Sequence, residues 1–203
     1  MAKFDYKKDL KELYFPPSKN PVLVDVPEMN FVMVDGSGDP NNSTQFQEAI
    51  EVLYGLSYTA KFALKKQGTG EEYVVPALEG LWWSPDMDVF VMGAKDKWLW
   101  TLMIMQPPAV TAELMAAASE ELRKRKNPTA LDRARFEAFT EGLCAQIMYI
   151  GPYSEEGLTI AGLHEFIKES GHSLRGKHHE IYMGDPRRTA PEKLKTVIRQ
   201  PIS

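Results

Sequence analysis

The same order of predicted elements, strand–helix–strand–strand, occurs twice along the chain, over residues 22–106 and again over residues 142–203. No clear residue identity relates the two copies, so the repeat is one of element order only. We predict that residues 107–141, which separate the two copies, form a helical linker and that residues 1–21 form an N-terminal arm. Two such copies can join into one antiparallel sheet with helices on one side and a central ligand cavity on the other face. We therefore expect an α+β fold, with residues 1–203 as a single domain.

In the first copy, the helix is predicted to begin at Thr44, where Thr44 and Gln47 form a capping box. A turn around residues 85–88 and a loop near Gly93 are expected between the last two strands. The apolar helix positions repeat at helical spacing: Phe46, Ala49, Ile50, Leu53, Leu56 and Ala60. The predicted strands cover residues 22–35, 73–83 and 98–105.

In the second copy, Ser154 is the expected N-cap of the helix, with Glu155 and Glu156 in the first turn, where carboxylates suit the helix dipole. Gly171 is expected to end this helix. In the linker, a helix is predicted from Thr111, followed by a short helical turn over residues 131–135. The predicted strands of this copy cover residues 142–150, 178–183 and 193–199.

The net charge of −4 gives no basic field that would hold a nucleic acid. The basic run Arg123–Lys126 is better explained as the end of a helix, where cations suit the unpaired carbonyls. No apolar run reaches membrane-span length, and no signal peptide is expected. The single cysteine, Cys144, fits a reducing cytosol. These observations predict a cytoplasmic protein without membrane or nucleic-acid partners, as either a monomer or a homodimer.

Residues 178–183 carry the best chemical signal. Side chains alternate along a strand, so His178, Glu180 and Tyr182 are predicted to share one face. His179, Ile181 and Met183 would share the other, so the adjacent histidines cannot easily chelate one metal. We expect no metal and no cofactor. A carboxylate beside a phenol can do acid–base work, but it can also be a solvated sheet face or half of an ion pair with a nearby Lys or Arg.

Four segments together resemble stand-alone GyrI-like small-molecule-binding proteins, in particular the branch that includes cyclopropanoid hydrolases. They are Glu79–Trp83, Gln146–Tyr153, His178–Tyr182 with the following Asp185–Arg188, and Lys193–Pro201. No helix-turn-helix precedes them, unlike in the transcription-factor relatives. The resemblance implies a central cavity between the repeats, in which an acidic residue of a late strand sits among aromatic rings. The matching position here is Glu180.

The resemblance further implies a hydrolase that opens the strained ring of cyclopropane-containing alkylating toxins, and thus a role in detoxification. Glu180, with a raised pKa, would be the base for water. A tyrosine would donate to the developing oxyanion, and Tyr153 or Tyr182 is favoured over Tyr149. Tyr149, Tyr182 and Glu180 are also expected to contact the bound ligand. Three tryptophans would sandwich a flat ligand: Trp83, Trp98 and Trp100.

Two other interpretations use the same residues. In the first, the protein is a non-catalytic module that sequesters or senses drugs, as some relatives are implied to do. Glu180 is then the counter-charge of a cationic ligand, and aromatic rings add cation–π attraction of roughly 0.5–2 kcal/mol each. In the second, the tryptophans and methionines simply fill the core, and Glu180 pairs with an arginine. An enzyme is favoured, with the binding module as the alternative.

Overall fold

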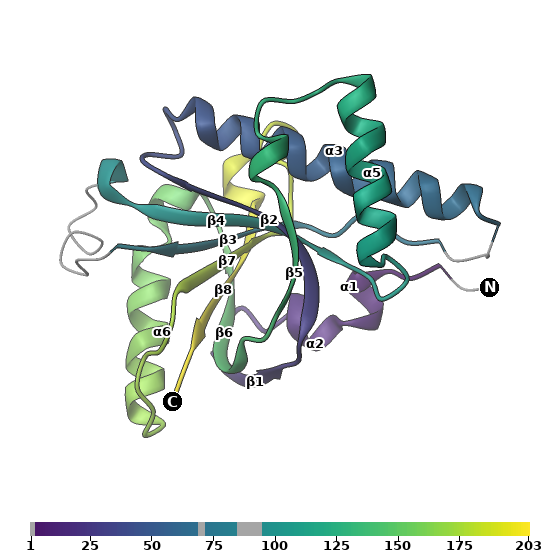
Figure 1. Ribbon diagram of the computed structural model, residues 1–203. Coiled ribbons are helices and arrows are strands. Elements are labelled where there is room, and N and C mark those ends of the chain that lie inside the picture. The colour runs from purple at the N-terminus through teal and green to yellow at the C-terminus, as the bar shows by residue number, and fades with distance from the viewer. Residues whose placement is uncertain (1–2, 69–71, 85–94) are drawn as a thin grey trace. The chain divides into compact units, whose positions relative to one another are not determined.

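The computed structural model describes residues 3–68, 72–84 and 95–203 (Figure 1). The chain forms two compact units, each built from two stretches of sequence. Unit 1 comprises Met1–Asp5 and Met29–Phe139, and unit 2 comprises Tyr6–Glu28 and Thr140–Ser203. The turn expected around residues 85–88 and the loop near Gly93 lie outside the described residues.

Unit 1 has four antiparallel strands in the order β3-β4-β2-β5. Helices α3 and α5 pack against each other in this unit (Figure 1). Short 3-10 turns cover Lys95–Lys97 and Leu131–Arg133. The strands are β2 (Met29–Ser37), β3 (Leu78–Trp83), β4 (Leu99–Gln106) and β5 (Arg135–Phe139), and the helices are α3 (Thr44–Lys66) and α5 (Ala112–Arg125).

The covered face of the unit 1 strands is organised around Trp100, which is fully buried. Trp100 lies directly opposite Gly36 across β2 and β4, and its indole ring occupies the space that a Cβ at residue 36 would need. The ring of Phe46, in the first turn of α3, meets Trp100 edge to face at 5.2 Å. A glycine is therefore required here for close packing of a large ring against the backbone.

Unit 2 also has four antiparallel strands, in the order β1-β6-β8-β7. Two 3-10 turns, Tyr153–Glu155 and Pro191–Lys193, precede α6 and β8. The strands are β1 (Val22–Val26), β6 (Gly142–Ile150), β7 (His178–Tyr182) and β8 (Lys195–Pro201), and the helices are α1 (Tyr6–Asp9), α2 (Lys11–Tyr14) and α6 (Gly157–Glu169).

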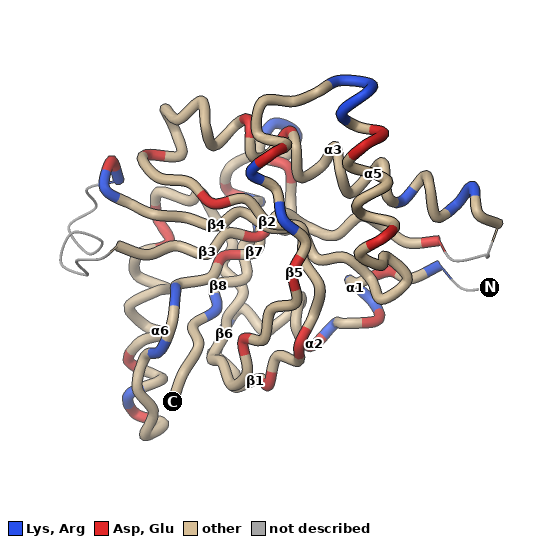
Figure 2. Tube along the Cα trace, in the orientation of Figure 1, with Lys and Arg blue, Asp and Glu red and all other residues tan. Residues whose placement is uncertain are grey.

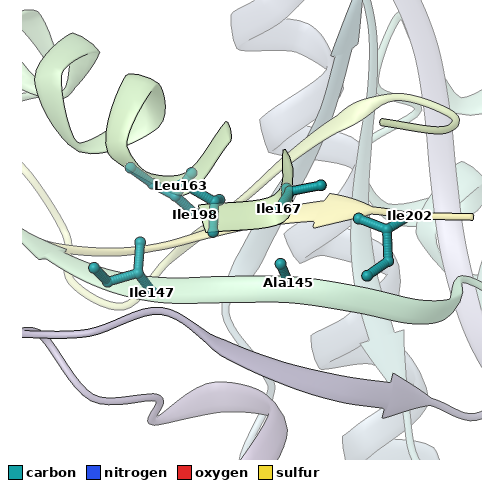
Figure 3. Close-up of a cluster of buried hydrophobic side chains, with 6 residues drawn as sticks. All are labelled: Ala145, Ile147, Leu163, Ile167, Ile198 and Ile202. Carbon is teal, nitrogen blue, oxygen red and sulfur yellow. The ribbon is translucent and has the colours of Figure 1, made fainter. Parts of the chain in front are cut away.

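Helix α6 covers one face of the unit 2 strands. Two of its residues, Leu163 and Ile167, are buried against inward-facing residues of β6 and β8, as the close-up of this cluster shows (Figure 3). Paired residues such as Ile147 and Ile198 point to the same side of the sheet and build this core. The full cluster is Ala145, Ile147, Leu163, Ile167, Ile198 and Ile202.

The opposite face of the unit 2 strands carries a buried polar network centred on Arg199. Its guanidinium donates to Glu141 Oε2 at 3.1 Å, to Gln146 Oε1 at 3.0 Å and to the Leu13 carbonyl of α2 at 2.6 Å. His179 Nδ1 lies 2.9 Å from Glu141 Oε1. Every charge in this network is therefore paired or hydrogen-bonded, and the network holds the N-terminal arm on the strands. The helices of unit 2 are thus not confined to one side.

The expected α+β class is confirmed, and so is the repeated strand–helix–strand–strand order, as β2-α3-β3-β4 and β6-α6-β7-β8. The linker is not wholly helical, because it also forms β5, which pairs with β2. The strand predicted over residues 22–35 is two strands. It divides at Pro27 and Glu28, and β1 pairs with β6 while β2 pairs with β4. Pairing partners distant in sequence decide this division.

The helix ends can be compared with the predicted caps. The helix predicted to begin at Thr111 is α5, and Thr111 is its N-cap, which accepts from the Leu114 N–H. Gly171 follows α6 with a φ of +80°, as predicted. The cap of α3 is Ser43, one residue before the predicted box, and its Oγ accepts from the Phe46 N–H. Ser154 is not a cap, because residues 153–155 form a 3-10 turn before α6 begins.

Acidic and basic residues are interspersed along the described chain (Figure 2). The basic run Arg123–Lys126 lies at the C-terminal end of α5, as expected, and Arg123 pairs with Asp132 at 2.7 Å. None of the helices within the described residues combines the length and the apolar character needed to cross a bilayer.

Candidate functional site

Glu180 lies in the middle of β7, directly opposite Ile198 of β8. Cross-strand partners point to the same side of a sheet, so Glu180 faces the side on which α6 packs over Ile198. We expected the acidic residue to lie on the sheet face that carries no helices, and that expectation is wrong. The helix-covered face holds Glu180, because the strand register places it in the same row as the apolar core.

Two neighbours on β7 hold the Glu180 carboxylate. Tyr182 donates its hydroxyl hydrogen to Glu180 Oε2 at 2.8 Å, and His178 Nε2 lies 3.2 Å from Oε1. The predicted common face of these three residues is therefore correct. The Glu156 carboxyl, at the N-cap position of α6, also contributes to the lowered pKa of Glu180. Only 12% of the Glu180 side chain is exposed, so these partners replace most of its water.

The pKa of Glu180 is shifted in the direction opposite to the one predicted. Burial by itself raises the pKa of this carboxyl. The hydrogen bond and charge of His178, the hydrogen bond from Tyr182 and the contribution of Glu156 outweigh burial and lower the pKa below its ordinary value. Glu180 is therefore ionised at neutral pH, held as a carboxylate by specific donors.

Tyr153 lies beside this cluster, on the 3-10 turn that leads into α6. Its ring meets that of Tyr182 edge to face, with centroids 5.6 Å apart and an interplanar angle of 78°. Such a geometry is favourable for two aromatic rings. The structure thus brings together Glu180, Tyr153 and Tyr182, the three residues that the sequence suggested for catalysis.

Three residues at this site were not predicted as site residues: His178, Glu156 and His164. His164 projects from α6, and its Nε2 is buried without a hydrogen-bond partner among the described residues. Burial, followed by the nearby His178, lowers the pKa of His164, so its imidazole is neutral at pH 7. The face shared with Glu180 was a signal for His178. No local pattern pointed to Glu156 or His164, because only the packing of α6 on the strands brings them to β7.

Tyr149 does not join the Glu180 cluster. Both Tyr149 and Tyr182 pair with Thr196, which lies between them on β8. The Tyr149 hydroxyl donates to the Pro152 carbonyl at 3.0 Å. Its ring lines a surface cavity of about 510 Å³ that also touches Thr159 and Lys19, on the β6 side of α6. Tyr149 therefore lines a cavity of unit 2 that is separate from the Glu180 cluster.

The three tryptophans predicted to sandwich a ligand belong to unit 1 and do not form one surface. Trp100 and Trp82 face each other across β3 and β4, on the side that Phe46 of α3 covers. Trp98 meets Trp82 edge to face at 5.8 Å, and the Lys95 ammonium lies 5.5 Å from its ring centre. Trp83 follows Trp82 and points to the other side. Trp100 is a core residue, and only Trp83 and Trp98 are partly exposed.

Within the described residues, no three His, Cys, Asp or Glu side chains converge in a way that would hold a metal ion. The Glu180 cluster consists instead of two carboxyl groups, two imidazoles and two phenols. Groups of this kind bind cations, orient water and move protons. The central cavity expected between the two copies stays a prediction.

Comparison with known proteins agrees with this fold. The model of the GyrI-like small molecule binding domain matches residues 19–203. No curated protein matches the chain. An uncharacterized conserved protein from Listeria innocua is 42% identical, with a TM-score of 0.91, over 98% of this chain and 100% of that chain.

A hydrolase encoded by lin2189 from Listeria innocua is 40% identical, with a TM-score of 0.86, over the full length of both chains. The C-terminal domain of EcmrR is 11% identical, with a TM-score of 0.54, over 91% of this chain and 97% of that chain, which shows a common fold alone. The chain belongs to the family of GyrI-like small-molecule-binding domains.

Proposed function

We propose that this protein binds small, flat, hydrophobic or cationic compounds at Glu180 and hydrolyses electrophilic cyclopropane-containing toxins among them. The observation that carries the proposal is the Glu180 carboxylate, largely shielded from solvent and held by His178 and Tyr182 in a small-molecule-binding domain. Support for hydrolysis comes from two Listeria innocua structures, 40% and 41% identical, that are named hydrolases.

The proposed hydrolysis requires only two protein groups, a base and a proton or hydrogen-bond donor. A cyclopropane ring conjugated to a carbonyl opens when the oxygen of water bonds to a ring carbon and one ring C–C bond breaks. The electron pair of that bond moves through the conjugated system to the carbonyl oxygen. A base must accept the proton that water loses, and a donor must meet the charge on oxygen. Well-placed acid–base groups accelerate such steps on the order of 10²–10⁴-fold.

In this scheme Glu180 accepts the proton from water. Because it is ionised at neutral pH, it is in the protonation state that a base needs. Tyr182 is already committed, since its single hydroxyl hydrogen is donated to Glu180 Oε2. Tyr182 therefore orients the base, and Tyr153 is the tyrosine proposed to donate to the ligand oxygen. The burial of Trp100 in unit 1 supports a structural role for this residue.

A non-catalytic binding module is the second candidate, and one observation favours it. The lowered pKa makes Glu180 a permanent anion at neutral pH, next to the paired rings of Tyr153 and Tyr182. An anion beside aromatic faces suits an organic cation, and each ring would add roughly 0.5–2 kcal/mol. In this case Glu180 supplies charge and does no chemistry.

The deciding experiment is turnover of a spirocyclopropyl dienone by the purified protein, compared with Glu180→Gln. Ring-opened product at many equivalents, lost in the variant, supports the hydrolase. The matched control is Glu155→Gln, which removes an exposed carboxylate of the same segment and should keep activity. Absence of turnover, with saturable binding of ethidium that weakens only in Glu180→Gln, supports the binding module. If the protein shows no turnover and no binding, both candidate functions are contradicted.

A further inference from the structure

Helix α3 carries a row of three aromatic rings, Tyr54, Tyr58 and Phe62, which we call the aromatic stripe. Successive members are four residues apart, so they lie on one face of the helix. Their ring centroids follow each other at 6.3 Å, from Tyr54 to Tyr58 and from Tyr58 to Phe62. Tyr58 is 45% exposed and Phe62 is 53% exposed. A single exposed ring is ordinary, whereas a contiguous apolar row indicates an interaction surface.

The aromatic stripe lies on the side of α3 that faces away from the strands. The opposite side of the helix, with Leu56 and Ala60, is buried. Helix α5 covers one flank of α3, where Arg125 donates to the Thr59 hydroxyl at 3.2 Å (Figure 1). Within the part of the chain that the structure describes, neither the strands nor α5 therefore covers Tyr58 and Phe62.

The charges along the stripe are arranged symmetrically about Tyr58. Glu51 lies seven residues before Tyr58 and Lys65 lies seven residues after it, and both are exposed. Seven residues make two helical turns, so both charges lie on the same face as the rings. Tyr54 and Phe62 likewise lie four residues before and after Tyr58. The stripe is therefore complementary to a copy of itself that runs in the opposite direction.

An antiparallel copy of α3 would satisfy both kinds of contact. It would bring Glu51 opposite Lys65 of the partner subunit, and Tyr54 opposite Phe62 of the partner subunit. A parallel copy would instead place each charge against its own kind, which is unfavourable. Acidic residues before basic ones also suit the dipole of an isolated helix. The dipole does not require the equal spacing about Tyr58, whereas a two-fold axis does.

Lys65 already has one partner within its own chain. Its ammonium lies 3.1 Å from Glu72 Oε1, and both side chains are well exposed. Such an exposed pair contributes little, so Lys65 can also approach Glu51 of the partner subunit. At an interface of this kind, the charges at the rim set the orientation and the buried rings supply most of the affinity.

We propose that the aromatic stripe is the interface of a homodimer, in which two α3 helices lie antiparallel about a two-fold axis at Tyr58. The proposal is independent of the proposed function, because the stripe belongs to unit 1 and Glu180 belongs to unit 2. One helix from each chain makes a small interface, so the dimer is weak, with a dissociation constant in the micromolar range.

The first measurement is sedimentation velocity of the full-length protein over a range of concentrations. Wild type should pass from monomer to dimer, and Tyr58→Ala should raise the dissociation constant at least about tenfold. Leu158→Ala is the matched control, since it removes a side chain that is 88% exposed on α6 and should change nothing. A wild type still monomeric at about 1 mM, or a Tyr58→Ala protein that dimerises as well as wild type, overturns the proposal. Circular dichroism checks that each variant is folded.

The second measurement tests the antiparallel direction by exchanging charges. Glu51→Lys and Lys65→Glu should each weaken the dimer, because each puts like charges opposite one another at both ends of the stripe. An equimolar mixture of these two variants should form heterodimers, and the double variant should recover the affinity of wild type. Single variants that dimerise like wild type, or a mixture that stays monomeric, would overturn the antiparallel interface. Both charges are exposed, so the variants should keep the wild-type fold.

Discussion

The hydroxyl of Tyr182 donates a 2.8 Å hydrogen bond to Oε2 of Glu180, two residues earlier on the same strand. Residues i and i+2 of a strand point to the same side, so β7 needs no other element to bring them together. The bond stabilises the charged form of the carboxyl and occupies the only hydrogen of the phenol. It therefore contributes to the ionisation of Glu180, together with His178, and it determines the role left for Tyr182.

Replacing Tyr182 with Phe should raise the pKa of Glu180. The hydrogen bond favours the carboxylate, so its loss favours the protonated acid. The change can be followed by ¹³C NMR titration of glutamate-labelled protein, with Glu180→Gln used to assign the signal. Tyr149→Phe is the matched control, because that hydroxyl donates to the Pro152 carbonyl and should leave the titration unchanged. An identical Glu180 titration in Tyr182→Phe would contradict the role given to this bond.

Replacing Arg199 with Met should strongly destabilise unit 2. The side chain is 1% exposed and is hydrogen-bonded to Glu141, Gln146 and Leu13, so its loss leaves the Glu141 charge buried with one partner fewer. Removing one partner of a buried ion pair costs about 3–5 kcal/mol, to be measured as the free energy of unfolding in urea. Arg187→Ala, which removes an exposed partner of Asp185, should cause no measurable change. Equal stability of the two variants would show that the network is dispensable.

Stability should fall as the pH drops from about 4.5 towards 2, with Glu141 as one cause. Burial raises the pKa of Glu141, but His179 and Arg199 together lower it to about 2, against 4.5 when unfolded. A depressed pKa stabilises the fold above the unfolded value, and this contribution, about 3 kcal/mol, is lost as the carboxylate is protonated. Urea unfolding of wild type and Glu141→Gln at successive pH values tests this. Glu141→Gln should have a lower free energy of unfolding than wild type at pH 7 and should lose less of it on acidification. If the free energy of unfolding depends on pH equally in both proteins, Glu141 is not a cause of the acid sensitivity.

Replacing Gly36 with Ala should destabilise unit 1, because the new methyl group would meet the indole ring of Trp100. Forcing extra atoms into a packed core costs about 1–3 kcal/mol. Gly162→Ala is the matched control, since nothing lies near the new Cβ in mid-helix, and about 0.5–1 kcal/mol of stabilisation is expected there. Thermal unfolding, followed by near-ultraviolet circular dichroism of the tryptophans, measures both. A Gly36→Ala protein as stable as the control would show that the ring moves freely.

Much of the fold could be predicted from local patterns. Alternation along residues 178–183 placed His178, Glu180 and Tyr182 on one face, and the apolar spacing after Thr44 identified α3. These predictions succeeded because the periods of strands and helices are local properties of the backbone. The caps of α3 and α6 were misplaced by a residue or more, because neighbouring Ser, Thr and Glu residues offer nearly equivalent signals.

The candidate site residues were likewise predicted only in part from the sequence. The sequence suggested Glu180, Tyr153 and Tyr182, and the structure places them in contact. It suggested three tryptophans as one ligand surface, whereas the register of β3 and β4 puts Trp100 in the core and Trp83 on the other side. Aromatic residues of one segment look alike in a sequence, and only strand pairing decides which way each ring points.

The sequence by itself determined the element order, the family and the neighbours that Glu180 has along its own strand. The tertiary structure decided which side of β7 is covered, and it brought Glu156 and His164 of α6 to the site. It also decided that Glu180 is ionised, through donors that outweigh burial. The helix and strand periods depend only on residues that are close in sequence. Desolvation and hydrogen bonding depend on groups that only tertiary packing brings together.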